Sequence, residues 1–318
     1  MSLKIAMPFR HHATHVCAEA RKMLTDAGFE LVCNDTGRVL DFNEQKAMIK
    51  DAYAVFAGTE KYDAAMLDGC DQLKVIIRFG VGTDNFDLEA MKKMGIAVGV
   101  IANYNSVAEF ALMLILSSMK NLPQLDQAVR AGKWSRFPMH ELSGKTVGLV
   151  GFGRIGKRLA ELLQGFDVKI LAYDPYMNEA EAVKRNVTPV TFETLLHESD
   201  IVSLHLPSTD ATHHIMNEAT FAQMKQDAYL INTSRGALID EVALKQALES
   251  GKLRAAGLDV YEKEPVTSPD NPLFSLDNIT LTPHTAAISY ETNYNGGIIC
   301  AQSVLNVREG KKPVYPLW

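Results

Sequence analysis

The sequence predicts an α/β protein built from two doubly wound parallel-sheet domains. Short β-branched, apolar runs alternate with longer helical stretches along the whole chain. The runs are apolar at successive positions, which is typical of parallel strands covered by helices on both faces. The chain has 318 residues, which suits about two domains of ordinary size. Repeated β-α-β units therefore imply an open, right-handed parallel sheet in each half.

The expected elements follow this alternation in order. Helical stretches are expected between the strands, for example at His15–Ala27 and Leu88–Met94. The expected strands share a short, apolar, β-branched composition and lie at Leu3–Met7, Glu30–Cys33, Ala54–Ala57, Val75–Ile77, Ile96–Ile101, Thr146–Val150, Lys169–Tyr173, Ile201–Leu206, Tyr229–Asn232, Ala255–Leu258 and Ile279–Leu281.

A further helix is expected from Ser106 onward. Ser106 and Glu109 have the spacing of a capping box, in which the Ser side chain accepts from the amide three residues on and the Glu reaches back. The following segment, Phe110–Leu116, is apolar on every face. This pattern favours a helix at a boundary between two domains or two subunits, although a core helix of one large domain has the same pattern.

The composition excludes several classes of function. Apolar residues make up 47% and charged residues 22% of the chain, and the net charge of −6 argues against nucleic acid or an anionic membrane as main partner. No apolar run approaches the roughly 18 residues of a membrane span, and the first residues resemble a strand rather than a secretory signal. The four cysteines form no C-x-x-C pair, so we expect reduced thiols and a cytoplasmic location.

A glycine-rich turn is the strongest local signal. The strand Thr146–Val150 runs into Gly151-x-Gly153-x-x-Gly156, and a helical stretch follows at Lys157–Gln164. The first glycine permits a tight turn, the second lets the backbone approach a pyrophosphate, and the third lets helix and strand pack closely. The pyrophosphate would then lie on the amides at the positive end of the helix. This order predicts a dinucleotide site.

An acidic residue completes that motif. Asp174 ends the next expected strand, at the usual distance of about 20 residues from the turn. Its carboxylate can accept from both ribose hydroxyls of an adenosine and would repel a 2′-phosphate. No Arg occurs among the three residues after it. The sequence therefore favours NAD over NADP.

Charged or titratable residues follow three expected strands in the second half. Arg235, Glu264 and His284 each lie just beyond a buried strand, where an open parallel sheet binds its ligands. Arg matches a carboxylate with a planar fork, His carries a proton near neutral pH, and a nearby Glu would stabilise the imidazolium and fix its ring. Each has an ordinary alternative: a surface ion pair, a structural turn or a loop contact.

With these residues identified, the chain resembles the D-isomer-specific 2-hydroxyacid dehydrogenases over nearly its whole length. The resemblance rests on motifs in the family's order, at Arg78–Asp87, Asn103–Glu109, Gly132–Trp134, Gly148–Gly156, Leu204–Pro207, Ile231–Gly236, Leu258–Pro265 and Thr282–His284. It implies a flavodoxin-like substrate-binding domain, residues 1–101 and 284–318, with a Rossmann NAD-binding domain inserted at 102–283. It also implies a homodimer, to which the helix after Ser106 contributes.

The resemblance implies roles for individual residues. Arg235 would bind the substrate carboxylate and carbonyl, His284 would be the acid/base, and Glu264 would be its partner. Asp259 would lie near the nicotinamide carboxamide. The expected NAD-binding residues are Gly151, Gly153, Arg154, Ile155, Gly156, Asp174, His205, Pro207, Thr212, Thr233 and Asp259. The expected substrate-binding residues are Arg78, Gly80, Val81, Gly82 and Asn103.

The expected activity is interconversion of a small 2-oxo acid and its D-2-hydroxy acid by hydride transfer, with D-3-phosphoglycerate among the substrates considered. The alternatives are a glyoxylate or hydroxypyruvate reductase and a non-enzymatic, NADH-sensing protein like the family's corepressors. A formate dehydrogenase is disfavoured, because its pattern would pair the His with Gln at the position of Glu264. His11, His12 and His15 invite a metal site, but no carboxylate or Cys stands at ligand spacing, so we expect none.

Overall fold

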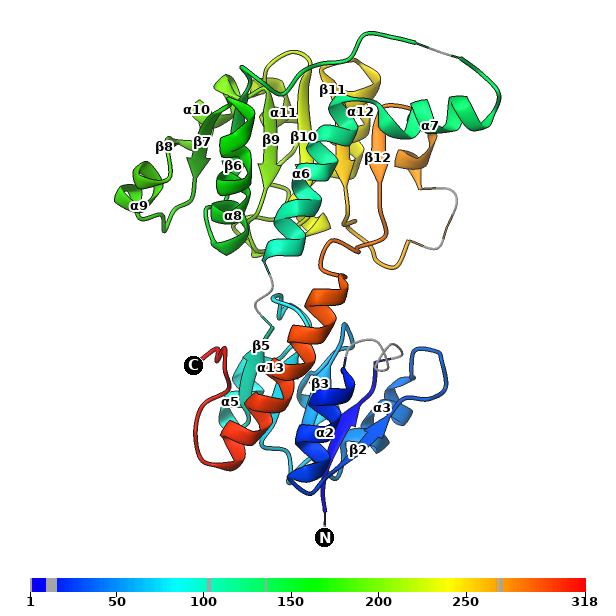
Figure 1. Ribbon diagram of the computed structural model, residues 1–318, viewed down its shortest axis with the longest axis vertical. Helices are drawn as coiled ribbons and strands as arrows, with labels where there is room; N and C mark the ends of the chain where they lie inside the picture. The colour runs from blue at the N-terminus through cyan, green and yellow to red at the C-terminus, as the bar shows by residue number, and fades with distance from the viewer. Residues whose placement is uncertain (1, 10–15, 102–103, 135, 267, 269–270) are drawn as a thin grey trace. The chain divides into compact units, whose positions relative to one another are not determined.

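The computed structural model describes residues 2–9, 16–101, 104–134, 136–266, 268 and 271–318. The chain divides into two compact units (Figure 1). Unit 1 comprises Met1–Asn103 and Ala287–Trp318, and unit 2 comprises Tyr104–Ala286. The sequence predicted the junctions between residues 101 and 102 and between residues 283 and 284. In the structure, the loop that carries His284 instead lies in unit 2 and not with the C-terminal segment.

Unit 1 contains a five-stranded parallel sheet in the order β2-β1-β3-β4-β5, which is the flavodoxin-like order. Its strands are β1 (Leu3–Met7), β2 (Phe29–Cys33), β3 (Ala52–Ala57), β4 (Val75–Arg78) and β5 (Ala97–Val100). Its helices are α2 (Ala18–Asp26), α3 (Phe42–Ile49), α4 (Ala64–Leu67), α5 (Leu88–Lys93) and the C-terminal α13 (Tyr290–Arg308). Helix α13 packs beside α2 and over β4, where Cys300, Ala301 and Val304 join the buried core (Figure 1).

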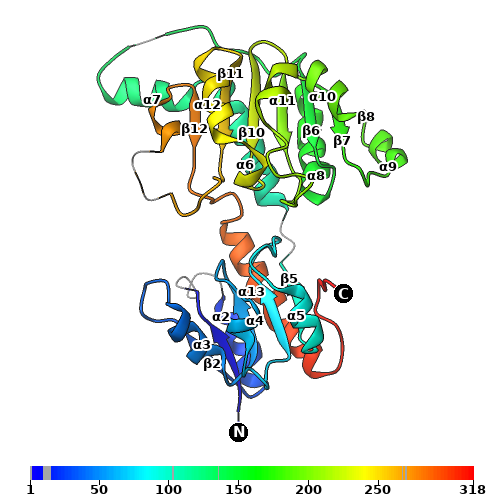
Figure 2. The same ribbon diagram turned by 180° about the vertical axis from the view of Figure 1, so that it is seen from behind.

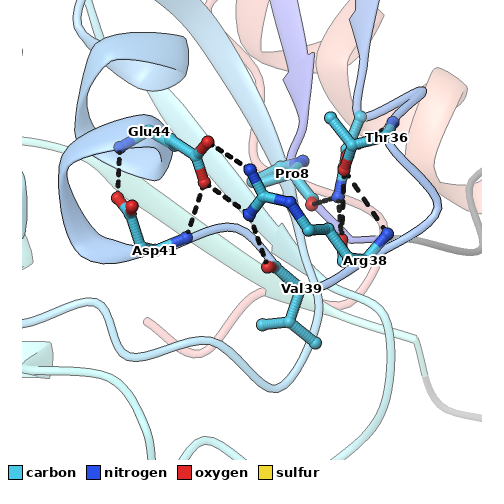
Figure 3. A network of polar contacts seen from close by, with 7 residues as sticks. Pro8, Thr36, Arg38, Val39, Asp41 and Glu44 are labelled. Carbon is cyan, nitrogen blue, oxygen red and sulfur yellow. Dashed lines mark hydrogen bonds and ion pairs between the residues drawn. The ribbon is translucent and has the colours of Figure 1, made fainter.

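Helix α3 shows how local polar contacts fix one element of this unit (Figure 3). Asp41 accepts from the Glu44 amide at 2.9 Å, and the Glu44 carboxylate accepts from the Asp41 amide at 3.0 Å, which completes a capping box. Arg38 binds the same carboxylate through both terminal nitrogens. This hydrogen bonding lowers the pKa of Glu44 to about 2, so the carboxylate remains ionised in mild acid.

Unit 2 contains a seven-stranded parallel sheet in the order β12-β11-β10-β9-β6-β7-β8. Its strands are β6 (Thr146–Val150), β7 (Lys169–Tyr173), β8 (Val187–Pro189), β9 (Ile201–Leu204), β10 (Ala228–Asn232), β11 (Leu253–Leu258) and β12 (Ile279–Leu281). Its helices are α6 (Asn105–Met119), α7 (Leu122–Arg130), α8 (Arg154–Leu163), α9 (Glu179–Lys184), α10 (Phe192–Glu198), α11 (Glu218–Gln223) and α12 (Glu241–Glu249). Helices α6 and α8 cover one face, and α10, α11 and α12 cover the other (Figures 1 and 2). The chain reverses its direction of winding between β6 and β9, which makes their carboxyl ends the topological switch point.

The predicted fold class is confirmed, and every predicted strand is present with its ends within two residues. The prediction missed β8, which has only three residues and ends at Pro189, so it offers little apolar pattern. Helix α8 begins at Arg154, three residues earlier than expected, because the glycine turn leads directly into it.

The expected capping box at Ser106 is wrong. Helix α6 begins at Asn105 with no side-chain cap, and the Ser106 hydroxyl instead donates to the Ala286 carbonyl at 2.6 Å. The helix buries one face against α8 and the sheet, while Glu109 and Met113 are exposed on the other. A hydrogen bond to a distant residue thus engages the Ser106 hydroxyl, which the local spacing had predicted to cap the helix.

The structure bears on two expectations, one about the cysteines and one about membrane spans. All four cysteines are free thiols. Within the described part of the chain, no helix combines the length and the apolar character that crossing a bilayer requires.

Candidate active site

The candidate site lies at the carboxyl edge of the sheet in unit 2. The loops after β6, β7, β9, β10, β11 and β12 all leave the sheet at this edge, because the strands are parallel. Open α/β sheets bind ligands at this edge, at the switch point. These loops carry the residues that the sequence singled out in unit 2.

The three glycines of the turn after β6 have different surroundings. Gly151 has a φ of +102°, and a Cβ there would come within 2.7 Å of the His205 carbonyl carbon. A Cβ at Gly156 would collide with the Gly151 carbonyl oxygen. A Cβ at Gly153 would meet nothing within 4 Å. Two glycines therefore permit close packing inside the protein, and the third leaves an open approach to the start of α8, as a bound pyrophosphate requires.

The start of α8 suits an anion. Gly153 is the N-cap, and no side chain caps the helix, so the amides of Arg154, Ile155 and Gly156 point out of its first turn. Asp174, at the end of β7, accepts from the Phe152 amide at 2.8 Å and thereby holds the turn against its neighbouring strand. A carboxylate has about four acceptor positions, so Asp174 retains capacity for ribose hydroxyls.

Two of the predicted cofactor residues carry buried polar atoms that have no hydrogen-bond partner among the described residues. They are Nδ1 of His205 and Oγ1 of Thr233. Burial lowers the pKa of His205 to about 4, so its ring is neutral near pH 7, and its Nε2 lies 3.0 Å from the Ser203 hydroxyl. Buried polar atoms normally have partners, so an orphaned hydroxyl at this edge indicates a ligand. The unpartnered Thr233 hydroxyl and the open space at Gly153 are together consistent with a bound dinucleotide.

The other two predicted cofactor residues of this region bind each other. The Thr212 hydroxyl donates to the Pro207 carbonyl at 2.8 Å and accepts from the Thr209 amide at 2.8 Å. These bonds close the loop after β9 on itself. Thr212 and Pro207 thus fix the shape of a loop that borders the glycine turn.

His284 and Glu264 form a direct pair. Nδ1 of His284 lies 2.5 Å from Oε2 of Glu264, and Oε1 of Glu264 accepts from the Tyr261 amide at 2.9 Å. His284 has a φ of +51°, and its amide donates to the Asp259 carbonyl at 2.7 Å. The backbone after β12 therefore turns sharply and presents the imidazole, which is partly exposed to solvent.

The charges around Glu264 favour its ionised form. Burial by itself would raise the pKa of Glu264, but the hydrogen bonds from His284 and the Tyr261 amide, with the positive charges of His284 and Arg235, hold the pKa below its usual value. Arg235, just beyond β10, donates to the Ser234 carbonyl at 2.7 Å. The structure thus brings the three predicted catalytic residues into one electrostatic group.

Asp259 has a positioning role. Its side chain is fully buried and accepts from the Thr282 hydroxyl at 2.6 Å, the Thr285 amide at 2.9 Å and the Ala286 amide at 2.8 Å. These bonds tie the end of β11 to the turn that carries His284. The sequence had predicted only a contact with the nicotinamide carboxamide, and that contact remains a prediction.

Four of the predicted substrate-binding residues lie together in unit 1: Arg78 ends β4, and Gly80, Val81 and Gly82 follow it closely. The Arg78 guanidinium donates to the Phe79 carbonyl at 2.7 Å and to the Gly82 carbonyl at 3.1 Å, so it braces the loop. Gly80 has a φ of +148°, and Val81 is exposed. Asn103, the fifth predicted residue, lies outside the described residues, as do His11, His12 and His15.

Sequence reasoning missed one polar cluster near this edge. His213, His214 and Glu262 place their donor atoms within 4.8 Å of one another. The neighbouring histidines gave a weak signal, but their carboxylate partner lies 48 residues further along the chain.

The parallel sheet and the open glycine turn together fit a dinucleotide-binding α/β protein. A profile described as "D-isomer specific 2-hydroxyacid dehydrogenase, NAD binding domain" matches residues 112–286. The chain belongs to this family, which confirms the resemblance and the NAD cofactor.

Three relatives illustrate the likeness. The chain is 41% identical over 254 residues to the D-3-phosphoglycerate dehydrogenase of Archaeoglobus fulgidus. This matched region covers 79% of the present chain and 48% of that dehydrogenase. It is 41% identical over 267 residues to the glyoxylate reductase of Thermofilum pendens, and this region covers 80% of the present chain and 78% of that reductase. The crystal structure of the TT0316 protein from Thermus thermophilus superposes with a TM-score of 0.88 at 29% identity. The superposition covers 99% of the present chain and 100% of the TT0316 chain. The chain thus spans about half of the phosphoglycerate dehydrogenase and most of the glyoxylate reductase.

Proposed function

We propose that the protein is an NAD-dependent D-2-hydroxyacid dehydrogenase that interconverts a small 2-oxo acid and its D-2-hydroxy acid. The observation that carries the proposal is the His284–Glu264 pair with Arg235 beside it, at the sheet edge that also holds the open glycine turn. An acid/base, a carboxylate-binding cation and a dinucleotide cradle are the groups that this reaction needs.

The cofactor would be held by the turn Gly151–Gly156, by Asp174 and by Thr233, and it supplies hydride transfer to or from C2 of the substrate. The amides at the start of α8 would receive the pyrophosphate, and Asp174 would receive ribose hydroxyls. The buried, neutral ring of His205 lies beside the turn, where a Cβ at Gly156 would come within 3.9 Å of its Cδ2.

His284 would move the proton. Its Nδ1 is engaged by Glu264, which fixes the ring and leaves Nε2 to deliver a proton to the alkoxide oxygen during reduction. The ionised Glu264 stabilises the charged imidazole from which that proton comes. In the oxidative direction the same nitrogen accepts the hydroxyl proton.

Arg235 would hold the substrate through a two-pronged contact with its carboxylate. The carboxylate-binding role expected for the backbone amides of Gly80, Val81 and Gly82 remains a prediction from the sequence. The contact with Arg235 would orient C2 for hydride transfer.

The surroundings of Arg78 favour an unphosphorylated substrate. Its guanidinium already donates to two backbone carbonyls. Burial raises the pKa of Glu60, which lies just after β3. The nearby positive charge of Arg78 lowers this pKa, but by less than burial raises it. The Arg78 donors that the two backbone carbonyls occupy are not available to a phosphate. We therefore place glyoxylate and hydroxypyruvate ahead of a phosphorylated 2-oxo acid.

The test is NADH oxidation at 340 nm with glyoxylate, hydroxypyruvate and 3-phosphohydroxypyruvate, with NADPH assayed in parallel. We expect turnover with the two unphosphorylated acids and a preference for NADH, because Asp174 repels a 2′-phosphate. Tight NADH binding without turnover on any acid would favour the NADH-sensing alternative. Preference for the phosphorylated acid would instead make the protein a phosphoglycerate dehydrogenase.

We also propose a homodimer, on the evidence of an apolar surface on α7 and the segment after it. Helix α7 buries none of its residues. Leu122, Val129 and Trp134 are 56%, 59% and 79% exposed, and Phe137 and Met139 are exposed as well. Five large exposed apolar side chains within one segment are a feature of protein contacts, and they support the dimer. Light scattering after gel filtration should give twice the chain mass, and Val129→Glu should shift it towards the monomer.

A further inference from the structure

A second histidine–glutamate cluster lies in unit 2, apart from the proposed catalytic pair. His213 and His214 lie in the loop between β9 and α11, and Glu262 lies in the loop after β11. Nε2 of His214 is 2.8 Å from Oε1 of Glu262, and Nε2 of His213 is 4.0 Å from the same oxygen. The two imidazole rings stack with their centroids 3.9 Å apart and their planes 22° apart.

An ordinary ion pair explains only part of this arrangement. It accounts for His214 and Glu262, but it does not require His213 to stack on its neighbour and direct Nε2 toward the same carboxylate oxygen. The stack brings both Nε2 atoms within 4.0 Å of one carboxylate oxygen. A neutral ring nitrogen offers a lone pair, which is what a metal ion binds.

Hydrogen bonds fix the backbone behind each of the three side chains. His214 has a φ of +48°, which directs its side chain across the loop. The supporting bonds run from the His213 amide to the Thr209 carbonyl at 2.9 Å, from the His214 amide to the Ala237 carbonyl at 2.9 Å, from Asn217 Nδ2 to the His214 carbonyl at 2.9 Å, and from the Glu262 amide to Oε1 of Glu241 at 2.8 Å. Binding an ion would therefore require only side-chain adjustment.

We propose that His213, His214 and Glu262 bind one divalent first-row transition-metal ion, such as Zn²⁺. In a tetrahedral zinc site the donor atoms are about 3.3 Å apart, given bonds of about 2.0–2.1 Å. The two distances to the Glu262 oxygen, 2.8 and 4.0 Å, lie on either side of this value. Two imidazoles with one carboxylate suit Zn²⁺, whereas Mg²⁺ and Ca²⁺ prefer oxygen ligands throughout. Water would complete the coordination.

The ion would join two loops that border the proposed active site. His213 directly follows Thr212 in the loop after β9, and Glu262 lies two residues before Glu264 in the loop after β11. A metal bridge between these loops would restrain the segment that positions the partner of His284.

The experiment is isothermal titration calorimetry of the untagged full-length chain with Zn²⁺, in the absence of cofactor and substrate. His214→Asn removes the imidazole while keeping a residue that tolerates positive φ, and Glu262→Gln removes the carboxylate charge. His197→Asn is the matched control, because His197 is an exposed histidine on α10. We expect the first two variants to lose one Zn²⁺ site or bind it at least about tenfold more weakly. The control should bind as the wild type does, and Mg²⁺ should not occupy the site.

A second readout reports the ligands directly. The electron paramagnetic resonance spectrum of added Cu²⁺ should show nitrogen coupling from two imidazoles, and His214→Asn should remove one of them. Equal Zn²⁺ affinity and stoichiometry in all four proteins would overturn the proposal, as would a wild type that binds no Zn²⁺. If His214→Asn fails to fold, Glu262→Gln alone decides. None of these readouts depends on dehydrogenase activity, so failure here leaves the proposed function standing.

Discussion

Unit 2 contains two His–Glu pairs that are alike in several respects and differ in their neighbours. Glu262 and Glu264 come from the same loop, and their partners His214 and His284 both have positive φ, at +48° and +51°. The pairs are bonded at 2.8 Å and 2.5 Å. What differs is the next group: Glu264 faces the positive charge of Arg235, whereas Glu262 faces a second imidazole.

This difference shows that a hydrogen-bonded imidazole is not by itself a catalytic group. Next to Arg235, the His284–Glu264 pair can act on a substrate whose carboxylate the arginine binds. Next to His213, the His214–Glu262 pair presents donor atoms to a cation. We therefore expect the neighbouring group, rather than the pair, to determine which kind of ligand each site accepts.

The largest expected effect separates the two histidines. His284→Asn should lower kcat on the order of 10²- to 10⁴-fold, because the proton donor is lost, with NADH binding nearly intact. His214→Asn, assayed with a metal chelator, should lower kcat far less. Steady-state kinetics and fluorescence titration with NADH measure both. Similar losses in the two variants would remove the functional distinction between the pairs.

The next prediction concerns the cation beside Glu264. Arg235→Lys should raise KM for the 2-oxo acid by about 10- to 100-fold, with a smaller change in kcat, because an ammonium cannot reproduce the two-pronged contact with a carboxylate. Initial-rate measurements over a range of acid concentrations give both constants. An unchanged KM would place the carboxylate elsewhere and would leave Glu264 without the neighbour that distinguishes it.

A smaller effect is expected for the carboxylates. Glu264→Gln keeps an oxygen for Nδ1 of His284 but removes the charge that stabilises the imidazolium, so kcat should fall about tenfold. Glu262→Gln is the matched variant from the same loop and should change kcat less. The pH profile of kcat should shift only in Glu264→Gln. A shift of equal size in both would mean that the loop responds as a unit to any lost charge.

Much of this site could be predicted from the sequence where a local pattern determines the geometry. The strand, the glycine turn and the helix after it are consecutive, and the acid at Asp174 comes at a fixed distance along the chain. The strands of a parallel sheet end at one edge, so Arg235, Glu264 and His284 could be grouped before their contacts were known. Such elements can be predicted from neighbouring residues and from the hydrophobic periods of helices and strands.

The parts that sequence reasoning missed depend on contacts between distant residues. Ser106 fits a capping box by spacing, yet it bonds to Ala286, 180 residues further along the chain. Asp259 is occupied by groups of the His284 turn, which only the folded chain brings beside it. The second histidine cluster requires positive φ at His214, and no side-chain pattern reports that.

The last and smallest prediction concerns stability in acid. The pKa of Glu264 is lower in the folded protein than its usual value of 4.5, so the ionised carboxylate stabilises the fold. For a lowered pKa, this contribution is complete above the unfolded-state value and disappears as the pH falls through the folded-state value. The difference in urea midpoint between wild type and Glu264→Gln should therefore be constant from about pH 7 to about pH 5 and shrink below about pH 4.5. A difference that instead grew on acidification would mean that the folded protein favours the protonated carboxyl, and Glu264 would then be unable to support a charged His284.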